Sequence, residues 1–144
     1  MERNELITRL QELYDKAENL FNNGKGTEAA ELLKQEIPAL DSAADVAGAI
    51  IPWLDVTSLL ANILLLLSRP EDALEYGRSV YEAAKLYLPG TLELIYATEL
   101  YASCLYAVGK NDEAKELFTE ALRGIETEIS EAEVLRDEIK EKLK

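Results

Sequence analysis

The chain has 144 residues, of which 48% are hydrophobic and 30% are charged, a composition that excludes a disordered protein and fits one compact domain. Its formal net charge of −13 disfavours binding to nucleic acids and to anionic membranes, because both present phosphate that Lys and Arg must neutralise. Histidine is absent, which excludes His-based acid–base catalysis, Ser-His-Asp triads and His-ligated metal sites. The composition therefore predicts a non-catalytic protein without a metal or cofactor.

Compartment and membrane signals come from the cysteine count and from two segments. Cys104 is the single cysteine, so no internal disulfide forms, which suits a reducing compartment such as the cytoplasm, or recombinant expression. The first ten residues are charged and lack the hydrophobic core of a signal peptide. Residues 46–67 are apolar enough to consider a membrane span, but a proline and two polar residues interrupt them and flanking positive charge is missing. We expect this segment to be a buried helix and the protein to have no transmembrane helix.

Hydrophobic periodicity near 3.6 residues, without period-2 alternation, predicts an all-helical single domain. Pro52 lies inside one expected helix and predicts a kink or a restart there. The sequence Ser130-Glu131-Ala132-Glu133 has the form of a capping box and predicts the start of a separate C-terminal helix. The expected helices span about 4–23, 27–37, 42–67, 69–87, 91–108, 111–126 and 130–143.

Small residues recur at fixed distances on either side of three polar turns. Leucine follows the first alanine of each pair by three positions, and Gly or Ser follows it by seven. Paired antiparallel helices approach closely only where the facing side chains are small, so this pattern predicts three helix-turn-helix units, at about 4–38, 42–87 and 91–126. The matching positions are Ala17 and Ala29, Ala61 and Ala73, Ala102 and Ala114; Leu20, Leu64 and Leu105; Gly24, Ser68 and Gly109.

The turn residues predict how the helices end and begin. Gly24 and Gly109 can adopt the left-handed conformation that closes a helix. In the middle unit Ser68 begins the sequence Ser68-Arg69-Pro70-Glu71, which predicts a capping box for the following helix. Thr27 and Asn111 are the expected N-caps of the other two second helices.

The turn at Gly109 and the sequence "DEAKELFTEAL" that follows (residues 112–122) resemble a tetratricopeptide repeat. This resemblance implies a right-handed superhelical stack of three units with a concave groove, closed by residues 130–143 as a capping helix. Residues 71–125 are also similar to the C-terminal helical domain of the SMYD family of SET- and MYND-domain lysine methyltransferases. That family's Asn-His-x-Cys and zinc-binding motifs are absent here, so the resemblance implies only its non-catalytic helical lobe.

On the tetratricopeptide template, the first helix of each unit lines the concave groove. Carboxylates, amides and aromatic rings occupy these positions without any Lys or Arg, so the resemblance implies a protein or peptide ligand that is apolar or basic. The alternative is that the leucines of this set are simply core residues. The lining residues implied are Tyr14, Asp15, Glu18 and Phe21; Ser58, Leu59, Asn62 and Leu65; and Tyr96, Glu99, Leu100, Ser103 and Tyr106.

Three functional interpretations follow from these features. The absence of His, the single Met and Cys, and the closing sequence "EIKEKLK" favour a designed or redesigned scaffold without an evolved partner. Pro52, the run "ILLLL" and the unequal repeats favour a natural adaptor that binds apolar or basic peptides. A small-molecule pocket or weak enzyme between the helices is the third. We adopt a monomeric, non-catalytic helical-repeat scaffold, designed or redesigned, that is able to bind peptides.

Overall fold

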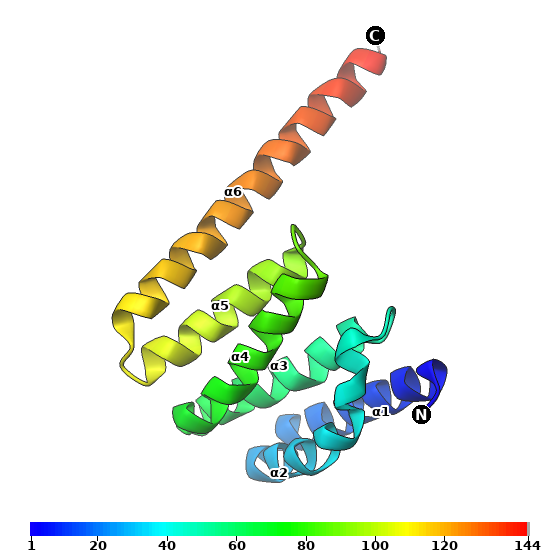
Figure 1. The fold of residues 1–144 in the computed structure, drawn as a ribbon, viewed down its shortest axis with the longest axis vertical. Coiled ribbons are helices and arrows are strands. Elements are labelled where there is room, and N and C mark those ends of the chain that lie inside the picture. The colour runs from blue at the N-terminus through cyan, green and yellow to red at the C-terminus, as the bar shows by residue number, and fades with distance from the viewer. Residues whose placement is uncertain (144) are drawn as a thin grey trace.

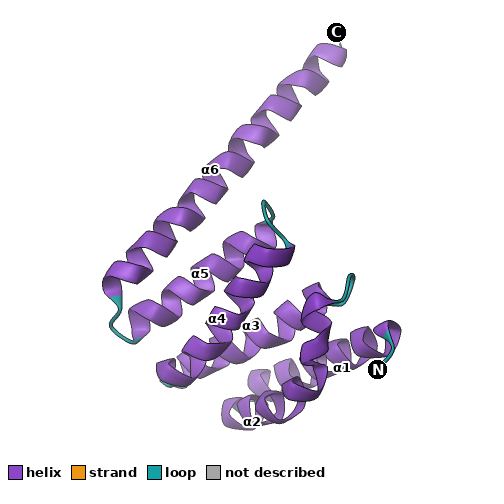
Figure 2. Cartoon of the chain, in the orientation of Figure 1, coloured by secondary structure: helices purple, strands orange, loops and turns teal. Residues whose placement is uncertain are grey.

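A computed structural model describes residues 1–143, and over that range the chain consists of helices joined by short turns (Figures 1 and 2). No strand occurs among these residues, which confirms the all-helical fold. The elements are α1 (Arg3–Asn22), α2 (Gly26–Glu36), the 3-10 helix η1 (Ile37–Asp45), α3 (Ile50–Leu66), α4 (Pro70–Tyr87), α5 (Leu92–Ala107) and α6 (Asn111–Lys142).

The helices are arranged in two rows. The first helices of the units, α1, α3 and α5, pack in sequence against one another, and each also packs against the helix that follows it. Within the described part of the chain, the backbones of α2, α4 and α6 do not pack against one another. The row of first helices is therefore the narrow, inner side of the stack, and α1 and α6 belong to its opposite ends (Figure 1).

Small residues bring the two rows together, as the repeat pattern predicts. All six alanines of the repeat are completely buried, at 0% exposure. Leu64 and Leu105 are buried beside them, while Leu20 is partly buried against the same core. At Gly77, α4 and α5 lie so close that a side chain would not fit, because a Cβ there would lie 2.9 Å from the Sγ of Cys104 on α5.

The three polar turns share one hydrogen-bonding pattern, a Schellman motif. Gly24, Ser68 and Gly109 have positive φ angles of 78°, 60° and 89°. Each donates its N–H to the carbonyl three residues back, and the next residue donates to the carbonyl of Leu20, Leu64 or Leu105. The repeated leucine thus marks the last turn of each first helix.

The cap residues predicted from the sequence are wrong at three of these positions. Ser68 ends α3 and does not cap α4, which begins at Pro70 without a side-chain cap. Thr27 and Asn111 already lie inside α2 and α6, whose N-cap residues are Lys25 and Lys110. The Schellman turn places the residue after Gly or Ser at the N-cap, so the cap positions fall on Lys25, Arg69 and Lys110, whose side chains cannot accept a hydrogen bond.

Of the two outcomes predicted at Pro52, a kink or a restart, the structure shows the restart, because η1 ends at Asp45 and α3 begins at Ile50. Pro52 is the third residue of that helix, where an N–H has no intrahelical partner and its loss costs nothing. The residues expected to begin this helix instead form η1, which follows α2 directly and has Pro38 in its first turn. The indole N–H of Trp53 donates to Asp41 at 3.1 Å and ties η1 to α3.

The separate capping helix predicted for residues 130–143 is also wrong as a boundary. α6 is continuous from Asn111 to Lys142 and runs through Ser130, because no Pro or Gly follows Gly124 to stop it. Every residue from 129 to 143 is exposed, so this segment buries none of its side chains against the stack and projects beyond it (Figure 1). None of the helices in residues 1–143 has the length and apolar character needed to cross a bilayer.

Candidate functional site

The inner side of the stack carries two neighbouring hollows. The first lies between α1 and α3 and is lined by Tyr14, Asp15 and Pro52, among others. The second lies between α3 and α5 and is lined by residues that include Ser58 and Tyr96. Asp55 on α3 lines both hollows. The two therefore adjoin at Asp55, and we refer to them together as the inner groove.

The inner groove is acidic. Asp15, Asp55, Glu93 and Glu99 line it, and no Lys or Arg is present among the described residues that form its walls. Asp55 is exposed, but partial desolvation raises the pKa of its carboxyl, and the nearby charge of Glu93 raises it further. A positively charged group of a bound partner would stabilise the ionised form of this carboxyl.

The aromatic residues of the inner groove combine exposed rings with polar ends. Tyr96 is 70% exposed and stands at the wall of the second hollow. Tyr14 is half-buried in the first, where burial and then its hydrogen bond with Glu18 raise the pKa of its hydroxyl. Such rings offer apolar contact area with a hydrogen-bonding tip.

The structure brings together only part of the predicted lining. Seven predicted residues line the hollows: Tyr14, Asp15, Ser58, Asn62, Tyr96, Glu99 and Leu100. Glu18 is exposed beside Tyr14, and Ser103 donates a hydrogen bond to Glu99 at 3.0 Å. Tyr106 is 64% exposed at the end of α5 and lines neither hollow. Phe21, Leu59 and Leu65 pack against the core, as the alternative interpretation holds for the leucines.

Sequence reasoning missed two central residues, Asp55 and Glu93. Asp55 interrupts the apolar segment 46–67, which was a signal that a carboxylate there faces a polar surface. Because Asp55 stands three residues before Ser58 and seven before Asn62, helical spacing alone places it on the same side of α3. Glu93 lies in the first turn of α5, one turn before Tyr96.

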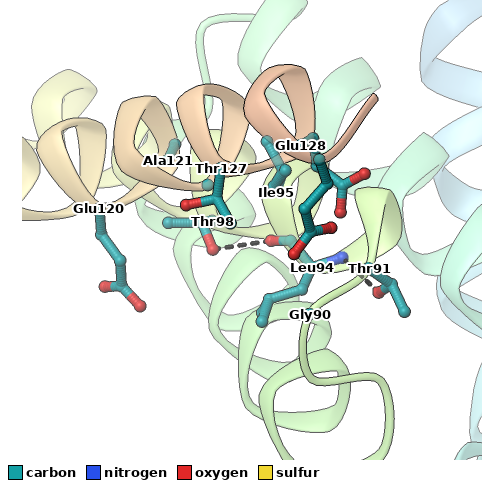
Figure 3. Close-up of a pocket in the computed structure, with 11 residues that line it drawn as sticks. Gly90, Thr91, Leu94, Ile95, Thr98, Glu120, Ala121, Thr127 and Glu128 are labelled. Atoms are coloured by element: carbon teal, nitrogen blue, oxygen red, sulfur yellow. Dashed lines mark hydrogen bonds between the residues drawn. The ribbon is translucent and has the colours of Figure 1, made fainter. Parts of the chain in front are cut away.

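A third hollow lies between the start of α5 and the middle of α6 (Figure 3). Gly124 opens it, since a Cβ there would lie 2.9 Å from the side chain of Ile95. The hydroxyl of Thr98 donates to the carbonyl of Leu94 at 2.7 Å, and that of Thr91 accepts from the N–H of Leu94 at 3.3 Å. These hydroxyls serve the backbone of α5 and are not free to act on a ligand.

Cys104 does not have the environment of a nucleophile. Its thiol is completely buried between α4 and α5 and lies 3.6 Å from the carbonyl of Ala73. Burial raises the pKa of the thiol to about 11, so the reactive thiolate is scarce at neutral pH. In residues 1–143 no three His, Cys, Asp or Glu side chains gather as a metal site would require.

The family model for the tetratricopeptide repeat matches residues 54–127, just over half of the chain. The chain belongs to the tetratricopeptide-repeat family. The match covers α4 and α5 completely, together with most of α3 and the first half of α6. The second and third helix-turn-helix units, α3–α4 and α5–α6, therefore correspond to tetratricopeptide repeats.

Two solved structures share this fold. Both contain the nearly identical TPR-like repeats of a Podosopora anserina protein described as a kinesin light chain, and one of them carries a single substitution. The structure of the substituted protein has a TM-score of 0.66 and 21% identity over 81% of this chain. The other has a TM-score of 0.65 and 23% identity over 85% of this chain. This chain spans only 55% and 57% of their lengths, and no curated protein matched its sequence.

Proposed function

We propose that this tetratricopeptide-repeat protein is a non-catalytic binding scaffold that takes an apolar or basic segment of a partner protein into the inner groove. The main observation in support is the lining of that groove. Its described wall residues include the acidic Asp15, Asp55, Glu93 and Glu99 but no Lys or Arg. Tetratricopeptide repeats are in general protein-interaction scaffolds, which supports the proposal at the level of the family.

The chemistry of the groove describes the segment it would hold. A Lys or Arg of the partner lies between Asp55 and Glu93, where its charge favours the ionised form of both carboxylates. An apolar side chain of the partner packs on the exposed parts of Ile51 and Tyr96 at the second hollow. The net charge of −13 adds long-range attraction for a basic segment and repels an acidic one.

Two origins of such a scaffold follow from the sequence, a designed protein and a natural adaptor. Ser68 in the left-handed conformation, where Gly is favoured, supports the natural adaptor, as does the row of exposed apolar residues on α6, because an idealising design avoids both. The similarity of residues 71–125 to the C-terminal lobe of SMYD proteins supports the same proposal of a non-catalytic interaction module.

A peptide array tests the proposal. We expect the chain to bind peptides rich in Lys, Arg and apolar residues and to leave acidic peptides unbound. The triple variant D55N/E93Q/E99Q should lose these hits. The matched control E71Q/E75Q/E82Q removes the same charge from the surface of α4 and should keep them. Binding that is lost equally in both variants reflects net charge alone and contradicts the proposed groove.

A further inference from the structure

From Leu122 to Leu143, one side of α6 carries a row of exposed and mostly apolar residues that nothing in the described chain covers. Exposure is 58% at Leu122, 42% at Ile125, 53% at Ile129, 49% at Ile139 and 82% at Leu143. These side chains are exposed over about six helical turns, and the last part of the helix projects from the stack (Figure 1). We call the row the α6 stripe; its apolar members are Leu122, Ile125, Ile129, Ala132, Ile139 and Leu143, Arg136 is its one charged member, and the exposed Val134 and Leu135 lie beside it.

The spacing of the α6 stripe is that of a coiled-coil seam. Its members alternate in steps of three and four residues without exception from 122 to 143, which gives the 3.5-residue repeat of a and d positions. Residues 129–143 of α6 are all exposed, and helices in proteins gain most of their stability from an apolar face packed on a neighbour. The stripe therefore fits one further helix with the same spacing.

Charges beside the α6 stripe identify that helix and its direction. Glu126 and Glu128 flank the stripe near its start, whereas Lys140 and Lys142 flank it near its end. When a second copy of the chain is placed antiparallel, with a positions opposite d positions, Glu126 meets Lys140 of the second copy and Glu128 meets Lys142 of the second copy. Each pair occurs twice, so four pairs of opposite charge border the seam.

The middle of the seam is compatible with the same arrangement. Ile129 lies opposite Ile139 of the second copy, and Arg136 lies opposite the small Ala132 of the second copy, which leaves room for the arginine stem. Leu135, which is 57% exposed, flanks the centre and meets its own counterpart. Glu133 also meets its own counterpart across this seam, which adds one repulsive pair, whereas a parallel pairing would place Glu128 beside Glu133 of the second copy twice and would lose the four attractive pairs.

We propose that two copies of this chain associate through an antiparallel coiled coil of their α6 stripes. The inference goes beyond the binding of peptides in the inner groove, and it departs from the monomer expected from the sequence. The paired segment from residue 125 to residue 143 is about 27 Å long at 1.5 Å per residue. A seam this short gives a weak dimer.

Sedimentation equilibrium of the full chain, from about 5 μM to about 500 μM, tests the dimer by its dependence on concentration. We expect a monomer–dimer equilibrium that the variant I129E/I139E abolishes. The charge variants E126K/E128K and K140E/K142E should each weaken the dimer about tenfold or more, because each turns four attractive pairs into four repulsive ones. All six substituted positions are at least partly exposed on α6, and circular dichroism checks that the fold is kept.

Mixing the two charge variants in equal amounts is the decisive step. In an antiparallel heterodimer the lysines introduced at positions 126 and 128 of one chain would face the glutamates introduced at positions 140 and 142 of the other. All four pairs are then attractive again, and the dimer should return to wild-type strength.

A chain that stays monomeric at all concentrations overturns the proposal. So does a dimer that I129E/I139E leaves intact, since it uses another surface. A dimer that E126K/E128K strengthens indicates parallel pairing and overturns the antiparallel arrangement.

Discussion

Replacing Ser68 with Gly should make the protein more stable, although the serine occupies a position where sequence rules favour a helix cap. Ser68 has φ of 60°, and a side-chain-bearing residue in this conformation costs roughly 1–2 kcal/mol. Glycine avoids that cost, but the greater backbone freedom of its unfolded chain lowers the free energy of unfolding by about 0.5–1 kcal/mol. We expect S68G to raise the free energy of unfolding by about 0.5–1 kcal/mol, which corresponds to a rise in Tm of about 1–4 °C.

Urea denaturation followed by circular dichroism measures this difference. The equivalent turns provide matched controls, because Gly24 and Gly109 have the same hydrogen bonds and φ angles of 78° and 89°. G109S and G24S should lower the stability by a similar amount, and S68A should bring no gain. If S68A and S68G both destabilise the protein by about 1 kcal/mol, the Ser68 hydroxyl does cap α4, and the reasoning from the Schellman turn is refuted.

Three further predictions concern the interior and the groove. G77A should destabilise the protein by about 1–2 kcal/mol in urea denaturation, because its Cβ would meet the Sγ of Cys104 at 2.9 Å. The double variant G77A/C104A should recover part of this loss. If the effects of the two substitutions simply add, the contact between these residues is contradicted. Cys104, with its pKa raised to about 11 by burial, should react with a thiol reagent at pH 8 only as fast as the protein opens, so rapid labelling of the native state would contradict its burial. Because burial and Glu93 raise the pKa of Asp55, its ionisation destabilises the fold as pH rises through that pKa. D55N should therefore be more stable than wild type at pH 7, by about 0.5 kcal/mol or less since the carboxyl is partly solvated, and equal to it in acid; a loss at pH 7 would contradict the sign.

The repeat was readable from the sequence because it depends on side-chain size at close helix contacts. The six alanines and the leucines at 20, 64 and 105 define the units without any knowledge of their packing. Sequence rules failed where two elements compete for one residue. Ser68 has both the sequence context of an N-cap and the position of a C-terminal turn residue, and the turn is favoured because it satisfies two backbone carbonyls.

The groove was only partly predictable, for a related reason. A template places residues on a side of a helix, but burial depends on where neighbouring helices come to lie. Leu59 and Leu65 share the side of α3 expected to face the groove, yet they pack against the core. Asp55 lies within an apolar segment, and neither the repeat pattern nor the tetratricopeptide template assigns it to the groove. The continuity of α6 was not predicted because a capping-box sequence inside a run of helix formers has no effect once the helix is already formed.

The most direct test of the account is to map where a basic, apolar peptide contacts the protein. We would titrate the isotope-labelled chain with a peptide of alternating Lys and Leu, follow backbone amide shifts by NMR, and repeat the titration with alternating Glu and Leu as the control. The account predicts saturable shifts clustered around Tyr14, Asp55 and Tyr96 with the first peptide and none with the second. Shifts spread over the acidic outer surfaces of α2 and α4, or equal responses to both peptides, would contradict a binding site in the inner groove.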